Sequence, residues 1–420
     1  MRHLLFLAAR SAWNRRLTLG LTLVAVALSV TLLLGVVRIR QEAKDSFSES
    51  ISGTDLVVGA RTSPVQLMLY AVFRIGEATN NMRWQSYQVL ASRPEVAWSI
   101  PLSLGDSHRG FPVLGTSTAY FEHFHYGSSQ ALVFSAGKPF ADVFDAVLGA
   151  DVADHLGYHL GDHITLSHGM SGQGLAEHAD KPFTVVGVLA RTGTPVDRTV
   201  HISLEAMEAI HLDWQGGAPM PGFTIPAEYV RKFDLTPKEI TAALVGLKSR
   251  AAVFKMQRTI NDSTPEALLG VLPGVALDQL WQVVSIVEHT LLAVAAMVVV
   301  VGLSGLTAVI LASLGERRRE LAILRSVGAK PSDVFLLLTA EGLSITVLGA
   351  LLGVLLLTLL TALLGPLAQS RFGLVIEPKW VSAEEFMLLA TVVGVGLCAS
   401  LVPGYRAYKL SLADGLTPRL

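Results

Sequence analysis

The sequence predicts a membrane protein with four transmembrane helices and one large α+β domain between the first helix and the second. The chain of 420 residues is 51% hydrophobic but only 16% charged, and its mean hydropathy is +0.49. Soluble domains carry roughly 25% charged residues, so this composition indicates membrane spans. Four apolar runs each reach the length of about 20 residues that crosses a bilayer. Residues 38–280, between the first run and the second, contain charges or prolines every few positions and predict a folded domain.

The four spans are predicted from the apolar runs themselves. The first covers residues 17–37 and is free of charge up to Arg38. It is too long, and its flanks are wrong, for a cleaved signal peptide. The second, third and fourth spans are predicted at residues 283–314, 334–364 and 386–403, the last ending at Pro403. Cys398, the single cysteine, lies in the fourth run and is predicted to be a small packing residue.

Basic residues near the spans predict the orientation of the chain. They gather in three segments, namely the N-terminal tail, the loop between spans two and three, and the C-terminal tail. Because short loops rich in Lys and Arg stay in the cytoplasm, both termini are predicted to be cytoplasmic and residues 38–280 extracytoplasmic. Residues 1–16 are predicted either to form an amphipathic helix on membrane lipids or to be an ordinary basic flank.

The extracytoplasmic domain shows a mixture of strand and helix patterns. Polar helical stalks are expected at residues 38–50 and 276–288, on either side of it. Strands are predicted at residues 55–59, 111–115, 142–148, 164–167 and 183–189. Helices are predicted at residues 150–156, 204–210 and 237–247, the last starting at Thr236. The mixture predicts an α+β domain.

The loop between spans two and three contains a distinctive amphipathic segment, GERRRELAILRSVGA at residues 315–329. Leu321, Leu324 and Val327 recur at helical spacing, charged residues occupy the first turn, and Gly328 can end the helix. A short amphipathic helix at residues 316–329 would fit a groove in a partner protein. The alternative is a simple basic flank of the membrane.

This segment resembles the hallmark of the FtsX/MacB-type permease family, which includes LolC-like, type VII ABC transporter permeases. Three other stretches are similar to family patterns: GTDLVV at residues 53–58, residues 147–166 with their LGADVADHLG and LGDHITL runs, and the ending at residues 403–416. The ending departs from the family at Ser411-Leu412 and Gly415, where Asp-Pro and Ala are usual. The resemblance covers nearly the whole chain.

The resemblance implies a MacB-like periplasmic core domain at residues 38–280 and an FtsX-like permease domain at residues 281–420. It implies a coupling helix that docks on a separate ABC ATPase subunit in the inner membrane complex through Glu316, Arg317, Glu320, Leu321, Leu324, Arg325 and Gly328. It also implies a second copy or a paralogous permease, and a periplasmic adaptor or binding protein, as further partners. The implied function is to couple ATP hydrolysis to movement of the outer domain, in export or mechanotransmission.

The sequence holds no motif of an enzyme. There is no G-x-x-x-x-G-K-[ST], so nucleotide binding is expected on the ATPase partner, and there is no H-E-x-x-H or G-x-S-x-G. No cofactor and no nucleic-acid partner are predicted. Two alternative functions stay open: a component of a zinc-uptake-linked ABC system, and a regulator of an envelope hydrolase that transports nothing.

Two kinds of residue inside the spans are candidates for a specific role. Small-xxx-small spacing predicts close helix packing at Gly349 and Gly353, and Gly302 and Gly305 offer a similar surface. Glu341 is the one acid in the third apolar run, and acids inside a membrane are costly. It is predicted to pair with Lys330 or an arginine, the alternative being proton or substrate handling.

Histidines are concentrated in the extracytoplasmic domain, where ten of the 12 lie between His108 and His211. His155, His159 and His163 recur every four residues and His168 follows, so a helix would place the first three on one face, where a transition metal such as zinc can bind. Against this, Gly157 and Gly161 interrupt the helix. Further candidates for the same site are His123, His125 and His178. The alternative is an ordinary polar surface.

Overall fold

The computed structural model describes residues 15–169, 177–215, 218–220, 222–263, 265–326, 328–372 and 380–409. The chain divides into two compact units. The helix bundle contains residues 1–42, 285–367 and 376–420, and the sheet domain contains residues 43–284 and 368–375. The predicted amphipathic tail lies almost entirely outside the described residues, as does the end of the C-terminal family motif.

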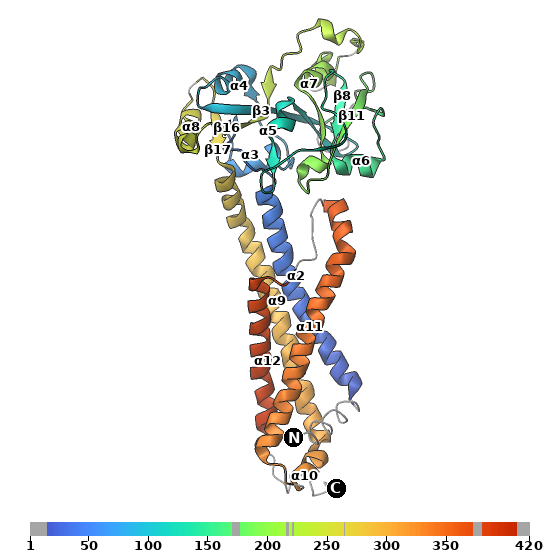
Figure 1. Cartoon of the computed structure of the whole chain (residues 1–420), viewed down its shortest axis with the longest axis vertical. Coiled ribbons are helices and arrows are strands. Elements are labelled where there is room, and N and C mark those ends of the chain that lie inside the picture. Colours follow the sequence, from blue (N-terminus) through green and yellow to red (C-terminus); the bar gives the residue numbers. More distant parts are fainter. Residues whose placement is uncertain are drawn as a thin grey trace. The chain divides into compact units, whose positions relative to one another are not determined.

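Four long helices carry the predicted spans: α2 (Arg16–Glu49), α9 (Pro273–Glu316), α11 (Pro331–Phe372) and α12 (Ala383–Lys409) (Figure 1). Each contains a segment long and apolar enough to cross a membrane. The predicted architecture, four spans with an α+β domain between the first and the second, is therefore confirmed. The polar stretch that was predicted as the first stalk is helical as far as Glu49.

The fourth span differs from the prediction at its end. Pro403 does not stop α12, which continues to Lys409. Proline cannot donate to the carbonyl of Ala399, four residues earlier. The hydroxyl of Thr307 on α9, which donates to the carbonyl of Leu303 at 2.9 Å, also lies 3.5 Å from the carbonyl of Ala399. Cys398 is exposed on the surface of the bundle, so its prediction as a packing residue is wrong.

The sheet domain is built on one mixed sheet, whose main path runs β17-β1-β16-β3-β4-β12-β8-β11-β7. Strands β4 and β12 pair in parallel, as do β8 and β11, and the other pairs on this path are antiparallel. The strands of the path are β1 (Leu56–Ala60), β3 (Val96–His108), β4 (Phe111–Thr116), β7 (Phe134–Gly137), β8 (Asp145–Leu148), β11 (Phe183–Leu189), β12 (Val200–Ser203), β16 (Ala242–Leu247) and β17 (Leu268–Val271).

Shorter strands complete the domain. Strand β9 (His163–Ile164) pairs with β11, and β10 (Ser167–His168) pairs with β3. Three two-stranded pairs lie outside the large sheet: β2 (Met82–Arg83) with β15 (Glu239–Ile240), β5 (His125–Tyr126) with β6 (Gln130–Ala131), and β13 (Trp214–Gln215) with β14 (Ala218–Pro219).

Both faces of the sheet are buried under helices. At the β1–β16 side, Val57 and Leu244 pack with α3 (Pro64–Ala71) and α5 (Ala119–His123) on one face. The side chains of Val58 and Val245, the next residues along the same strands, pack on the other face with α4 (Trp84–Ala91) and α8 (Val253–Asn261). At the β8–β11 side, α6 (Ala150–Leu156) and α7 (Leu204–His211) cover a third apolar cluster.

The helix predicted at residues 237–247 is wrong, because this segment forms β15 and β16. Every residue of β16 is buried, and a continuous apolar run does not distinguish a buried strand from a buried helix. Within this strand Gly246 leaves no room for a side chain, since a Cβ there would lie 2.2 Å from the Trp98 ring on β3. The predicted strand at residues 142–148 begins only at Asp145, and that at residues 164–167 divides into β9 and β10.

Candidate functional site

Helix α10 (Arg318–Ser326) follows α9 after a single non-helical residue, Arg317. The helix is shorter than the predicted segment, and Glu316 is the last residue of α9. The C-terminal end of α10 has the geometry expected from Gly328. The amide of Ala329 donates to the carbonyl of Leu324, and Gly328 has a left-handed φ of 107°.

The two sides of α10 have different surroundings. Leu321 is 5% exposed and packs in the core of the bundle, with Leu324 partly buried beside it. Ile323 is 52% exposed, and Glu320 and Ser326 are exposed as well. Leu321, one of the residues expected to couple to the ATPase, therefore packs on the bundle, and its role in docking stays a prediction. The exposed edge of α10 is formed by Glu320 and Ile323.

Glu341 on α11 forms ion pairs with two arginines from other parts of the bundle. Its Oε2 accepts a hydrogen bond of 2.7 Å from Nη1 of Arg317, and its Oε1 accepts one of 3.1 Å from Nη2 of Arg15. Arg317 also lies 3.7 Å from Glu320. The side chains of Arg317 and Glu341 are 6% and 15% exposed. We call Arg15, Arg317, Glu320 and Glu341 the Glu341 cluster; it connects α10 with the beginning of α2 and with α11.

Close helix packing occurs at three of the four glycines chosen from the sequence. A Cβ at Gly349 would lie 2.7 Å from Val26 of α2, and one at Gly353 would lie 2.8 Å from the carbonyl of Ala27. A Cβ at Gly302 would lie 2.9 Å from the hydroxyl of Ser29, whereas Gly305 has nothing within 4 Å. Helix α2 is therefore in close contact with α11 and α9.

A second group of charges, which the sequence analysis did not identify, joins α2 to the beginning of α12. Nε and Nη2 of Arg38 donate to the two carboxylate oxygens of Glu385 at 2.9 and 3.1 Å, and both side chains are buried. Ser382 and Glu385 also bond each other's backbone amides, which is a capping box. The spacing Ser-x-x-Glu before an apolar run was the sequence signal for this feature.

The three histidines at four-residue spacing do not form a site, so that prediction is wrong. Helix α6 ends where Gly157 takes a left-handed φ of 69°, and His159 and His163 follow outside it. Nδ1 of His155 donates to the carbonyl of Asp151 in its own helix. The ring of His163 lies 3.3 Å from the hydroxyl of Thr184 on β11.

His168 belongs to a different group, formed with Asp106, His178 and His211. Burial raises the pKa of Asp106, but the nearby imidazoles of His168, His178 and His211 outweigh it and hold this pKa well below the usual value. Burial lowers the pKa of His211, but Asp106 raises it more, so it lies above the ordinary value. Of these partners the sequence analysis named His178 as a further candidate and missed Asp106 and His211.

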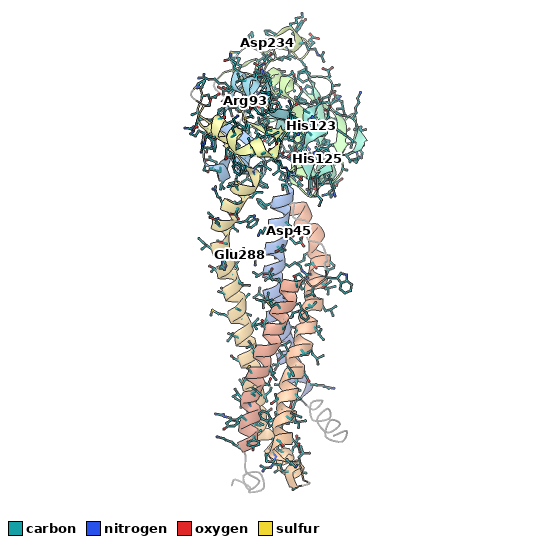
Figure 2. All side chains as sticks on the ribbon, turned by 60° about the vertical axis from the view of Figure 1, so that its left-hand side comes forward. Asp45, Arg93, His123, His125, Asp234 and Glu288 are labelled. Atoms are coloured by element: carbon teal, nitrogen blue, oxygen red, sulfur yellow. The ribbon has the colours of Figure 1, made fainter. Side chains whose placement is uncertain are left out.

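His123 and His125, the other candidates of the sequence analysis, lie elsewhere in the sheet domain (Figure 2). The ring of His123 stacks on Trp98, with ring centroids 5.5 Å apart. Nδ1 of His125 donates to the carbonyl of His123. A metal ion can be held by at least three neighbouring His, Cys, Asp or Glu side chains. Among the described residues, Asp106, His168, His178 and His211 form the one such group.

Four candidate spans, a sheet domain between the first two, and a short amphipathic helix after the second define a multi-pass membrane protein. The family model of the MacB-like periplasmic core domain matches residues 19–261, and that of the FtsX-like permease C-terminal domain matches residues 292–412. The chain belongs to this FtsX/MacB-type permease family, and it is a multi-pass protein of the inner membrane.

Curated relatives extend the likeness over most of the chain. The "Macrolide export ATP-binding/permease protein MacB" of Azoarcus sp. (strain BH72) is 25% identical over 350 residues, which are 80% of this chain and 48% of that protein. The "Macrolide export ATP-binding/permease protein MacB 1" of Yersinia pestis bv. Antiqua (strain Antiqua) is 25% identical over 80% of this chain and 47% of that protein. The chain thus spans about half the length of these relatives and matches their permease part.

Two solved structures are also similar. The periplasmic region of MacB from Actinobacillus actinomycetemcomitans is 12% identical, with a TM-score of 0.32, and covers 56% of this chain and 94% of that one. The extracellular domain of the noncanonic ABC-type transporter YknZ from Gram-positive bacteria is 13% identical, with a TM-score of 0.29, and covers 52% of this chain and 99% of that one.

Proposed function

We propose that the chain is the permease subunit that couples ATP hydrolysis on an ABC ATPase subunit to movement of the sheet domain. Three findings support this function. The chain belongs to the FtsX/MacB-type family, its 420 residues contain no Walker motif, and the names of its relatives combine ATP binding with a permease. In this proposal the work is done on the extracytoplasmic side, in export or mechanotransmission, and not through a central pore.

The exposed edge of α10 is the proposed docking surface for the ATPase. Ile323 offers an apolar side chain to a partner, and the exposed carboxylate of Glu320, which lies 3.7 Å from Arg317, stands on the same edge. Leu321 anchors the same helix in the bundle, so a force applied to the exposed edge acts on the spans and not on a detached loop. An amphipathic helix that presents one face to its own protein and one edge to a groove is suited to this task.

The Glu341 cluster is the observation that carries the coupling proposal. Arg317 stands at the junction of α9 and α10, and it binds Glu341 on α11, which in turn binds Arg15 immediately before α2. Charge pairs in surroundings of low dielectric interact strongly and are costly to separate. A displacement of α10 should therefore move three spans together instead of breaking these contacts.

Orientation and assembly follow from the same proposal. The arginines around α10 and at the start of α2 support a cytoplasmic position for that end of the bundle and an extracytoplasmic one for the sheet domain. Two copies of the chain, or the chain and a paralogue, would bind the two subunits of an ATPase dimer. Exposed apolar side chains on α9 are available to lipid or to the second permease; they include Ile286, Val287, Leu291 and Val294.

Copurification tests the docking surface. The tagged chain is purified in mild detergent from its native membranes, and the accompanying ABC ATPase is quantified. Ile323→Asp and Glu320→Arg should each lower ATPase recovery about tenfold, which corresponds to about 1.4 kcal/mol of binding free energy. Ile323→Val, which keeps the apolar contact, is the matched control and should recover as much ATPase as the original chain.

Two results would contradict the proposal. One is that no ABC ATPase accompanies the original chain. The other is that the Ile323→Asp and Glu320→Arg variants both recover as much ATPase as the Ile323→Val control.

A further inference from the structure

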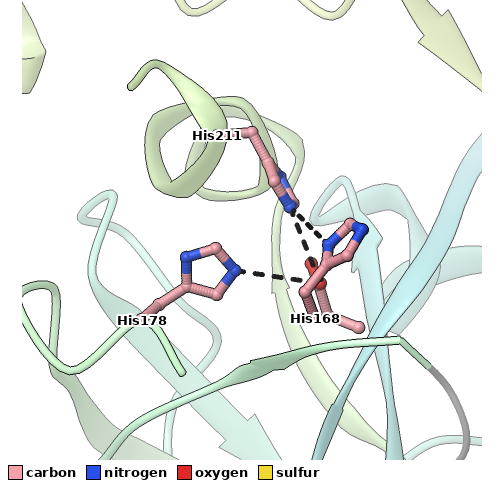
Figure 3. A group of neighbouring side chains, drawn as sticks. His168, His178 and His211 are labelled. Atoms are coloured by element: carbon pink, nitrogen blue, oxygen red, sulfur yellow. Dashed lines mark hydrogen bonds and ion pairs between the residues drawn. The ribbon is translucent and has the colours of Figure 1, made fainter. Parts of the chain in front are cut away.

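Four side chains from distant parts of the sequence converge in the sheet domain. Asp106 lies on β3, His168 on β10, His178 in the segment before β11, and His211 at the end of α7. One ligand atom from each lies within 4.8 Å of all the others. Figure 3 shows the three imidazole rings directed toward a common point. None of the four belongs to the surface proposed for ATPase docking.

The distances within the group match the spacing of ligands around a small metal ion. Oδ1 of Asp106 lies 3.1 Å from Nδ1 of His168, 3.9 Å from Nε2 of His178 and 3.6 Å from Nε2 of His211. Nδ1 of His168 and Nε2 of His211 are 3.1 Å apart. Ligands bound tetrahedrally at about 2.0–2.1 Å from zinc are about 3.3–3.4 Å from one another. Small adjustments of the side chains would therefore complete a tetrahedral site.

Two members of the group are buried without enough hydrogen bonds of their own. Asp106 and His178 are both 0% exposed. Oδ2 of Asp106 and both ring nitrogens of His178 have no hydrogen-bond partner among the described residues. Buried polar atoms are normally paired, because leaving one unpaired costs free energy. A metal ion bound to Oδ1 and to Nε2 of His178 would compensate the buried carboxylate charge and give that nitrogen its missing partner.

His211 is already oriented as a metal ligand. Its Nδ1 donates a hydrogen bond of 2.8 Å to the carbonyl of Met207, one turn earlier in α7. In the neutral ring this bond places the lone pair on Nε2, which faces Asp106 and His168. A backbone carbonyl that accepts from the other ring nitrogen is the usual way in which proteins fix the tautomer and direction of a ligating histidine.

The surrounding structure holds the ligand-bearing segments in place. His168 and Asp106 are direct partners in the register of β10 and β3. The buried ammonium of Lys181 bonds both carboxylate oxygens of Asp213 at 2.9 Å, which ties the segment after His178 to the segment after His211. The Trp214 ring packs 4.3 Å from the His178 ring, centroid to centroid. His168, whose side chain is 34% exposed, leaves a way in from solvent.

We propose that Asp106, His168, His178 and His211 bind a divalent transition metal ion, and that Zn²⁺ is the ion the site fits best. Three imidazole nitrogens and one carboxylate oxygen are the borderline ligands that zinc takes in tetrahedral sites. Ca²⁺ and Mg²⁺ require sets of oxygen ligands, which this group does not offer. Because the ligands come from four separate segments, the bound ion cross-links the β3–β10 edge of the sheet to α7.

A metal titration of the full chain in detergent tests this site directly. The protein is stripped with a chelator and titrated with Zn²⁺ by calorimetry, and with Co²⁺ by visible absorption as a probe of geometry. We expect one ion per chain with micromolar or tighter affinity, the absorption bands of four-coordinate Co²⁺, and a higher thermal unfolding midpoint with Zn²⁺. Absence of stoichiometric binding at micromolar metal, or an octahedral Co²⁺ spectrum, would overturn the proposal.

Matched histidine variants identify the ligands. His178→Gln and His211→Gln should each weaken Zn²⁺ binding about 100-fold or more, since even the hydrogen-bond partners of metal ligands contribute roughly 10–100-fold. His155→Gln and His163→Gln, from the set at four-residue spacing, are the controls and should bind as the original chain does. Unfolding of each metal-free variant verifies that it is folded. Zn²⁺ affinity that survives both ligand substitutions, or that is lost with either control, would overturn the assignment even if the original chain binds metal.

Discussion

Glu341 in the helix bundle and Asp106 in the sheet domain are both carboxylates in buried surroundings, but the groups around them differ in kind. Glu341 is paired with two arginines. Asp106 is surrounded by three histidines. Arginine keeps its charge at every pH at which the protein is folded, whereas imidazole can lose its proton and offer a lone pair. The first arrangement is suited to a permanent mechanical contact, and the second to binding a cation.

Removing each carboxylate is the strongest test of this difference. Glu341→Ala removes the closest carboxylate of the buried Arg317 and should lower the free energy of unfolding by about 3–5 kcal/mol. In metal-free protein, Asp106→Asn should lower the free energy of unfolding by only about 1–3 kcal/mol, because the neighbouring imidazoles can be neutral and then leave no unpaired buried charge. Unfolding of the purified chain in detergent mixtures measures both values, and Glu341→Gln, which keeps a hydrogen-bond acceptor, is the control. Equal losses for Glu341→Ala and Asp106→Asn would remove the distinction between the two groups.

His201 sharpens the comparison, because it is a buried histidine that no acidic side chain contacts among the described residues. It packs against Tyr120 and Phe121, and burial, with a contribution from Arg74, lowers its pKa to about 3. In the unfolded chain the pKa of this histidine is about 6.5, so between about pH 3 and pH 6.5 the unfolded chain binds a proton at His201 and the folded chain does not. Stability should fall as the pH drops below about 6.5, and at pH 5 the loss from this residue should reach about 2 kcal/mol.

The measurement for His201 is the unfolding free energy of the full chain at pH 7 and pH 5. His201→Phe should remove about 2 kcal/mol of the difference between the two values, and His163→Gln, an exposed histidine, should leave it unchanged. An identical loss of stability on acidification in the original chain and in His201→Phe would show that His201 is not buried in its neutral form.

The sequence predicted best those features that depend on composition over a long stretch. Twenty apolar residues in a row identify a span whatever its neighbours are, and so all four spans were found. Residues 237–247 show the opposite case, because a continuous apolar run fits a buried strand as well as a helix. The pairing that makes this segment a strand is with β3, which comes from a different part of the chain.

The candidate sites were predictable only in part, for a related reason. Periodicity showed that α10 has an apolar face, but not that Leu321 would pack on its own bundle. The spacing of His155, His159 and His163 suggested a shared face, which the end of α6 at Gly157 prevents. Asp106 and His168 become neighbours only through the pairing of β3 with β10, which no local pattern contains.

The central claim is that the Glu341 cluster transmits movement from α10 to the sheet domain. The most direct test attaches two spin labels to one chain, at Val89→Cys on α4 and Leu291→Cys on α9, both exposed positions, with the exposed Cys398 replaced by Ala. The distance between the labels is measured in the complex with the ATPase, with and without ATP. The account predicts that ATP changes this distance in the otherwise unaltered chain, and leaves it unchanged in Glu341→Gln although that variant still recovers the ATPase. The same ATP-driven change in Glu341→Gln would contradict the account.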